Sequence, residues 1–138
     1  MPETEYVIHP IGWVESPLVD RDAAPPQGDE GAPDAWIVLD PSMRPAAGDL
    51  DVGTEVVVLT WLDRTDRDTL VVHPRGDRDR PARGVFSTRS QDRPNPIGLH
   101  TVQVRAIDDS RIRVSNLEAL DRTPVVDIKP VLGPVAER

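Results

Sequence analysis

The sequence predicts an all-β fold, mainly antiparallel, in which a single small β-barrel carries long loops. Three observations lead to this prediction. The apolar segments are short and rich in valine, isoleucine and threonine, none keeps a helical period over the length of a helix, and proline, glycine and aspartate separate them. With 138 residues the chain has the size of one domain, so we expect residues 1–138 to form one domain with no additional C-terminal domain.

Eight strands are expected, each a short apolar run bounded by turn residues. The clearest run is 102–106, where apolar and polar residues alternate with the period of a sheet that buries one face. A polar turn at 108–110 follows and predicts a hairpin with the next run. Because Trp13, Trp36 and Trp61 fall inside apolar runs, we expect them to pack in the core. The expected strands are residues 6–14, 35–39, 55–62, 69–72, 84–87, 99–107, 111–114 and 125–128.

The composition excludes several classes of protein. The chain contains no cysteine, which removes disulfides and cysteine zinc sites and predicts a cytoplasmic location. The longest apolar run, residues 56–59, is far shorter than the roughly 20 residues of a membrane span, so no membrane association is expected. Neither a P-loop nor a GxGxxG turn occurs, which excludes the common nucleotide-binding motifs.

Charged and metal-binding side chains are distributed unevenly. The net charge is -8, which argues against a protein that holds a long nucleic acid by its overall field. Residues 75–93 nevertheless carry six arginines and three aspartates, so this segment is basic. The alternating charges of residues 63–68 indicate a solvated turn. His9, His73 and His100 lie on separate segments without metal-site spacing, and we expect no metal.

The segment GVFSTRSQDRPNPIGLH, residues 84–100, predicts a stiff loop that meets a ligand. Pro94 and Pro96 fix their own φ angles and push the preceding residues, Arg93 and Asn95, toward extended conformations. Such a loop loses little entropy on binding, and we expect Arg93 and Asn95 to contact substrate. The alternative is a proline loop that only turns the chain between two strands.

A second polar segment, residues 115–130, places Asp127 and Lys129 two positions apart, so on a strand they share a face. They form either an ion pair on the rim of the barrel or a carboxylate and ammonium that line a site.

Three segments together resemble the TrmO-like (TsaA-like) methyltransferase family. They are GVFSTRSQDRPNPIGLH (84–100), LEALDRTPVVDIKP (117–130) and IGWVESP (11–17), and the resemblance runs from about Tyr6 to Pro130. It implies a β-barrel enzyme that uses S-adenosylmethionine to methylate N6 of threonylcarbamoyladenosine in the anticodon loop of tRNA. It also implies a homodimer.

The resemblance further implies site residues. Arginine suits the methionine carboxylate, carboxylate and hydroxyl groups suit the ribose, and apolar side chains suit adenine. For the chemistry, we expect Asp127 to accept a proton or orient the substrate and Lys129 to act electrostatically. The implied cofactor contacts are Pro26, Gln27, Gly28, Asp63, Arg64, Arg89, Leu99, Ser115, Asn116, Leu117 and Glu118.

The chain departs from the family pattern at several positions. The early loop reads Pro25-Pro26-Gln27 where the family commonly has Pro-Arg-Gln, Asp63 stands where a histidine is common, and Val131 replaces an aromatic residue. With the acidic charge balance, these changes leave two alternatives open. One is a methyltransferase that acts on a small metabolite, and the other is a non-catalytic module that binds S-adenosylmethionine.

Overall fold

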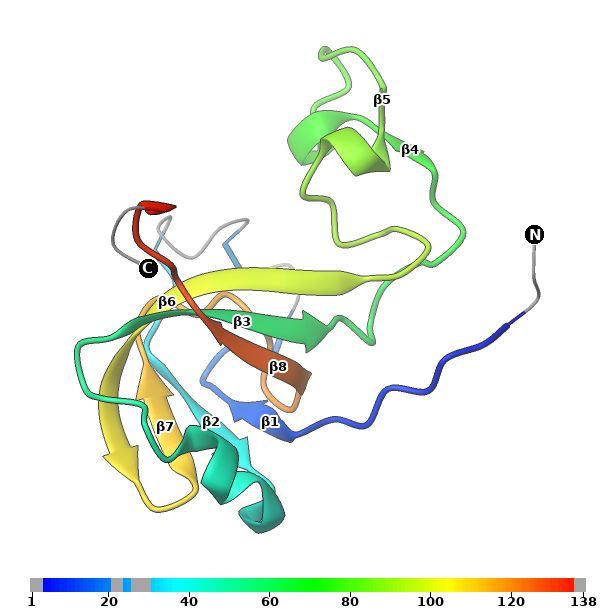
Figure 1. Cartoon of the computed structure of the whole chain (residues 1–138). Coiled ribbons are helices and arrows are strands. Elements are labelled where there is room, and N and C mark those ends of the chain that lie inside the picture. The colour runs from blue at the N-terminus through cyan, green and yellow to red at the C-terminus, as the bar shows by residue number, and fades with distance from the viewer. Residues whose placement is uncertain (1–3, 21–23, 26–30, 136–138) are drawn as a thin grey trace.

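Six strands form one antiparallel sheet in the order β1-β2-β7-β6-β3-β8, and β8 pairs with β1 to close it into a barrel (Figure 1). The computed structural model describes residues 4–20, 24–25 and 31–135. The predicted antiparallel all-β class is confirmed. The barrel strands are Gly12–Glu15 (β1), Ala35–Leu39 (β2), Glu55–Trp61 (β3), Ile97–Asp108 (β6), Arg111–Val114 (β7) and Pro124–Pro130 (β8).

Two of the expected strands are largely absent. Of residues 6–14 only the last three belong to β1, because Pro10 has no amide hydrogen to donate and residues 4–10 are exposed. Of residues 84–87 only Gly84 lies in a strand, because Val85–Ser87 is a 3-10 helix (η5). The Val85 carbonyl there accepts hydrogen bonds from the Thr88 hydroxyl and from Arg93, so side chains take the place of a strand partner.

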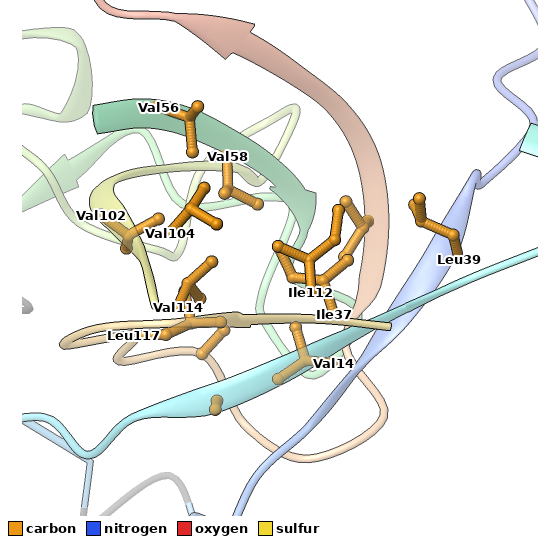
Figure 2. Packing of buried hydrophobic residues seen from close by; sticks show 13 residues of the cluster. Val14, Ile37, Leu39, Val56, Val58, Val102, Val104, Ile112, Val114 and Leu117 are labelled. Carbon is orange, nitrogen blue, oxygen red and sulfur yellow. The ribbon is translucent and has the colours of Figure 1, made fainter. Parts of the chain in front are cut away.

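Aliphatic side chains fill the barrel interior (Figure 2). Strand alternation points every second residue inward, and burying each such side chain contributes about 1.5–3 kcal/mol. Gly12 has no side chain because an added Cβ would overlap the carbonyl oxygen of Val38 on the neighbouring strand. The fully buried aliphatic residues of the cluster include Val14, Ile37, Val56, Val58, Val104, Ile112, Val114, Leu117 and Val125.

The expectation that the tryptophans pack in the core is wrong. Trp13 is 45% exposed, and Trp36 alternates with the buried Ala35 and Ile37, so it faces outward. The interior is already filled by smaller side chains, and arginines cover the outward indoles. Arg111 stacks over Trp36 at 4.6 Å, and Arg67 over Trp61 at 5.1 Å.

A projection stands away from the barrel between β3 and β6 (Figure 1). We call residues 71–87 the arm. It consists of the two-stranded sheet of Val71–Val72 (β4) and Arg83–Gly84 (β5), with the 3-10 helices Pro74–Gly76 (η4) and η5. A further 3-10 helix, Pro41–Ala47 (η3), follows β2. Its N-cap Asp40 accepts a hydrogen bond from the Ser42 amide, which lowers the pKa of the Asp40 carboxyl.

Substitution of two neighbouring valines tests the register of β3. Val58→Thr should lower the free energy of unfolding by about 1–3 kcal/mol, because it buries a hydroxyl that has no partner. Val57→Thr should change it by about 0.5 kcal/mol or less, since Val57 faces outward and is only partly buried. Urea unfolding measures both. Equal losses would show that the alternation of β3 is assigned wrongly, because a one-residue slip exchanges the two faces.

Candidate functional site

A cleft of about 920 Å³ lies between the arm and one end of the barrel. The barrel contributes the segment that follows β3, the first residues of β6 and the segment after β7. The arm and the loop between η5 and β6 form the other wall. The cleft is lined by Ala24, Pro25, Leu62, Asp63, Arg64, Thr65, Val72, His73, Pro74, Arg80, Arg83, Ser87, Thr88, Arg89, Ser90, Gln91, Arg93, Ile97, Gly98, Leu99, His100, Glu118, Ala119, Leu120 and Thr123.

The proline loop, residues 88–96, is held by side-chain hydrogen bonds. Arg93 donates to the carbonyls of Val85 and Thr88, so its guanidinium ties the loop to the arm. From the other side Arg67 donates to the Pro94 carbonyl at 2.8 Å and to Asn95 Oδ1 at 3.0 Å. Arg93 and Asn95, the expected substrate contacts, therefore hold the loop itself, and Arg93 also lines the cleft. Their contact with substrate stays a prediction.

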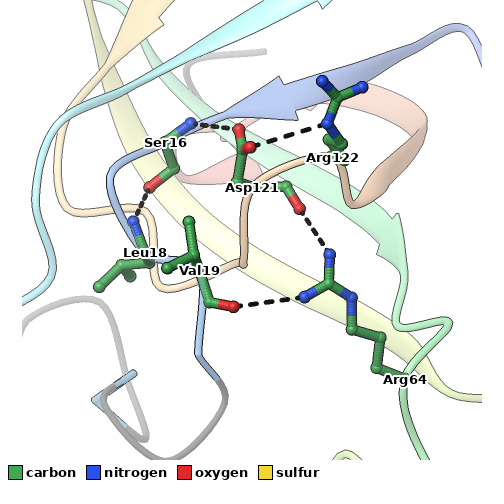
Figure 3. Close-up of polar contacts among 6 residues, drawn as sticks. All are labelled: Ser16, Leu18, Val19, Arg64, Asp121 and Arg122. Atoms are coloured by element: carbon green, nitrogen blue, oxygen red, sulfur yellow. Dashed lines mark hydrogen bonds and ion pairs between the residues drawn. The ribbon is translucent and has the colours of Figure 1, made fainter.

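Arg64, which lines the cleft, bonds to Val19 and Asp121, and Figure 3 shows these contacts. Its guanidinium donates to the carbonyl of Asp121 at 3.1 Å and to that of Val19 at 3.4 Å. Asp121 in turn accepts a hydrogen bond from the Ser16 amide at 3.0 Å. Arg64 thus joins the segment after β3 to two segments distant in sequence, and it lines the cleft. Its contact with the cofactor stays a prediction.

Arg89 differs from Arg64 and Arg93. It is exposed and lines the cleft, and its guanidinium makes no hydrogen bond or ion pair with any residue that the structure describes. The carboxylate of Asp63 is exposed in the same cleft. Of the two expected cationic cofactor contacts, Arg89 is the one whose donors are available to an anionic ligand group.

A buried chain of hydrogen bonds reaches the cleft from inside the barrel. The Thr60 hydroxyl lies 2.7 Å from His100 Nε2, and His100 Nδ1 lies 2.6 Å from Glu118 Oε1. Gly98 makes this contact possible, because an added Cβ would overlap the Thr60 hydroxyl oxygen and lie 2.7 Å from His100 Nε2. Sequence analysis missed Thr60 and gave His100 no functional role. The inward alternation of Gly98, His100 and Val102 was the available signal.

The residues of the expected cofactor segment 115–118 differ in whether they line the cleft. Glu118 lines the cleft, but Ser115 and Leu117 are buried and do not. The Ser115 hydroxyl accepts a hydrogen bond from the Gln103 amide at 3.0 Å. Asn116 is exposed with a φ of 50°. The expected contacts Pro26, Gln27 and Gly28 lie outside the described residues.

Asp127 and Lys129 share the outer face of β8, as the sequence predicts. Their side chains form an ion pair at 2.9 Å, with Asp127 44% and Lys129 62% exposed. Neither lines the cleft. They pair in register with Leu59 and Val57 of β3, whose side chains also face outward. Their catalytic role stays a prediction.

Two features are absent from residues 4–20, 24–25 and 31–135. No group of three or more histidine, aspartate or glutamate side chains there could hold a metal ion. No helix in that part of the chain is long and apolar enough to cross a membrane.

The sequence profile described as the tRNA-methyltransferase O N-terminal domain matches residues 13–135. The chain belongs to this TrmO family. A relative in Methanothermobacter thermautotrophicus, named a probable S-adenosyl-L-methionine-binding protein, is 42% identical over 94% of this chain and 93% of its own length. An Archaeoglobus fulgidus relative, named an S-adenosyl-L-methionine-binding protein, is 38% identical over 89% of this chain and 87% of its own.

Solved TrmO structures share this fold. A crystal structure of TrmO from P. aeruginosa matches with a TM-score of 0.75 at 28% identity, covering 99% of this chain and 61% of that chain. Another TrmO crystal structure gives a TM-score of 0.75 at 29% identity, with 96% and 57% coverage. The chain thus spans about three fifths of these solved TrmO chains. The resemblance inferred from the sequence motifs is confirmed.

Substitution of Gly98 tests the close approach beneath the cleft. Gly98→Ala should lower the free energy of unfolding by about 1–3 kcal/mol, because the added methyl group must displace Thr60 or His100. Gly84→Ala is the matched control, since its Cβ would meet nothing within 4 Å. Thermal or urea unfolding measures the difference. A Gly98→Ala protein as stable as the control would contradict the assigned packing.

Proposed function

We propose that this chain is an S-adenosylmethionine-dependent methyltransferase that acts on N6 of threonylcarbamoyladenosine in the anticodon loop of tRNA. The observation that carries the proposal is the TrmO family match over residues 13–135. The names of the archaeal relatives support the cofactor, and the family description supports tRNA as the class of acceptor. The cleft supports the proposal as a candidate binding site for the cofactor.

The groups that line the cleft fit S-adenosylmethionine. Arg89 offers unpaired donors for the methionine carboxylate, and Glu118 and Asp63 offer carboxylate oxygens for the ribose hydroxyls. Leu99 and Ile97, each 43% exposed, offer apolar surface for adenine. The volume of about 920 Å³ lies within the range of small-molecule sites, about 300–1,000 Å³.

The bound cofactor would supply a methyl group on a positively charged sulfur. The task of the chain is then to hold the acceptor nitrogen in line with that methyl group and to exclude water, which accounts for much of the rate enhancement in such reactions. The side-chain anchors of the proline loop suit this task, because Arg67 and Arg93 fix one wall of the cleft before a ligand arrives.

The arm supports an RNA acceptor. Arg80 and Arg83 of the arm line the cleft together with Arg89 of the proline loop, and Arg80 also forms an ion pair with Asp77 at 3.6 Å. Cationic side chains at the mouth of a cleft attract phosphates, while the acidic remainder of the protein repels RNA elsewhere. A small-molecule acceptor would need fewer arginines than this cleft offers.

The positions of Asp127 and Lys129 favour a reaction in which a second protomer takes part. They lie on the outer face of β3, β6 and β8, beside the outward side chains of Leu59 and Leu99. A second molecule that covered that face would enclose them together with an acceptor. We infer a homodimer that covers it, in which Asp127 accepts a proton or orients the substrate and Lys129 acts electrostatically.

Calorimetric titration with S-adenosylmethionine tests the cofactor site. The wild-type chain should bind, and Arg89→Gln should weaken binding about tenfold or more, because it removes a charged hydrogen bond worth at least about 1.5 kcal/mol. Arg105→Gln is the control, since Arg105 is exposed and does not line the cleft. Absence of binding heat in the wild type would refute the cofactor assignment.

A methyl-transfer assay tests the acceptor. With bulk tRNA that lacks the N6-methyl group, the wild type should transfer methyl to threonylcarbamoyladenosine, detected by mass spectrometry of the digested tRNA. Arg83→Gln should weaken tRNA binding and reduce the slope of log affinity against log salt by about one, unlike Arg105→Gln. Transfer to small metabolites but not to tRNA would favour the metabolite alternative. Tight cofactor binding without any turnover would favour the non-catalytic module.

Asp127→Asn tests the assigned role of the outer-face carboxylate. Turnover should fall about 100-fold or more while S-adenosylmethionine affinity stays the same, because the variant removes a proton acceptor outside the cofactor cleft. Sedimentation analysis should show that the variant keeps the oligomeric state of the wild type. Unchanged turnover would remove Asp127 from the mechanism.

A further inference from the structure

We propose that Thr60 and His100 are positioning residues that hold the Glu118 carboxylate in one orientation toward the cleft. The inference rests on the proposed function, in that the oriented carboxylate would receive the ribose hydroxyls of S-adenosylmethionine. It concerns residues inside the barrel that have no contact with the cofactor.

The three residues come from three parts of the sheet. Thr60 is on β3, His100 is on β6, and Glu118 follows β7. Thr60 is fully buried and His100 is 4% exposed, whereas the Glu118 side chain is 14% exposed and lines the cleft. The chain of hydrogen bonds therefore runs from the closed interior to the ligand space.

The donors and acceptors can be assigned along this chain. An ionised carboxylate only accepts hydrogen bonds, so His100 Nδ1 carries the proton that is shared with Glu118 Oε1 across 2.6 Å. In the neutral imidazole, Nε2 is then an acceptor, and the Thr60 hydroxyl donates to it across 2.7 Å. The Glu118 carboxylate, which only accepts, selects this tautomer, and the Thr60 hydroxyl holds the other ring nitrogen and so fixes the orientation of the imidazole.

The second oxygen of Glu118 faces the cleft. No described residue bonds to Oε2, and no buried side-chain nitrogen or oxygen in this part of the chain is left without a partner. Oε2 is therefore accessible to solvent. One carboxylate oxygen is fixed by the protein and the other is free for a ligand hydroxyl.

The arrangement resembles a nucleophile, a base and an acid, but the burial of Thr60 excludes that role. Its hydroxyl has no exposed surface and does not line the cleft, so no substrate can reach it. The chain of hydrogen bonds also has a structural role, because without Glu118 the buried Nδ1 proton of His100 would have no partner. The bond to Glu118 orders a side chain at the ligand site.

Affinity for S-adenosylmethionine in a double-mutant cycle tests the inference. Thr60→Val keeps the volume of the side chain and removes the hydroxyl. It should weaken binding of S-adenosylmethionine about three- to tenfold, because the released Glu118 side chain would lose its rotamer freedom only when the ligand binds. Thr60→Ser should restore binding. In a Glu118→Ala background, Thr60→Val should have no further effect, because the side chain it orients is gone.

A control variant separates this effect from general destabilisation. Ile112→Val shortens a buried side chain that does not line the cleft, and its affinity should equal that of the wild type. A Thr60→Val protein that binds like the wild type would overturn the inference, as would an equal loss in both backgrounds. In either case the wild type still binds, and the proposed function stands.

The NMR signals of the His100 imidazole nitrogens test the inference in the ligand-free protein, without the cofactor. Selective ¹⁵N labelling of histidine should show the Nδ1-protonated tautomer for His100, and Thr60→Val should shift its Nε2 signal. An Nε2-protonated tautomer in the wild type would overturn the inference even if S-adenosylmethionine binds. A wild type that shows the expected tautomer but binds no S-adenosylmethionine would refute the proposed function and the ribose role of Glu118 together.

Discussion

The pairing of β3 with β6 on one side and β8 on the other fixes the geometry of the whole cleft. Because side chains alternate along a strand, this register directs Val56, Val58 and Thr60 inward and Val57 and Leu59 outward. The end of β3 then delivers the segment 62–65 to the cleft. The same register brings Gly98 opposite Thr60, where the missing side chain leaves room for His100. A slip by one residue would remove the core and the cleft floor together.

Outside the barrel, hydrogen bonds from side chains to main-chain carbonyls hold the segments together in place of strand pairing. Arg64 and Arg67 donate to carbonyls of segments distant in sequence. Arg93 donates to carbonyls five and eight residues before it, and together the three arginines fix the rim of the cleft. An arginine suits this task because its planar guanidinium presents several donors at fixed angles. Among the arginines of the basic segment, residues 75–93, Arg93 is used in this way. Those that the described residues leave unpaired, such as Arg89 and Arg83, are the ones that can meet an anion.

The sequence predicted the fold class because alternation and turn residues are local signals. The hairpin between β6 and β7 and the shared face of Asp127 and Lys129 followed from strand period alone. The tryptophans were assigned to the wrong side, because an apolar run does not show which of its residues face inward. The family motifs indicated Glu118, but no local signal connected it to Thr60. That contact depends on register between distant strands, which only the folded chain establishes.

Backbone amide NMR during titration with S-adenosylmethionine tests the central claim, that the cleft between the arm and the barrel end holds the cofactor. The account predicts that the shifted signals cluster at residues 62–65, 87–91, 97–100 and 118–120, which line the cleft. Signals of β2 and β7, on the opposite wall of the barrel, should not move. Shifts concentrated on β2 and β7, or no shifts at saturating cofactor, would contradict the account.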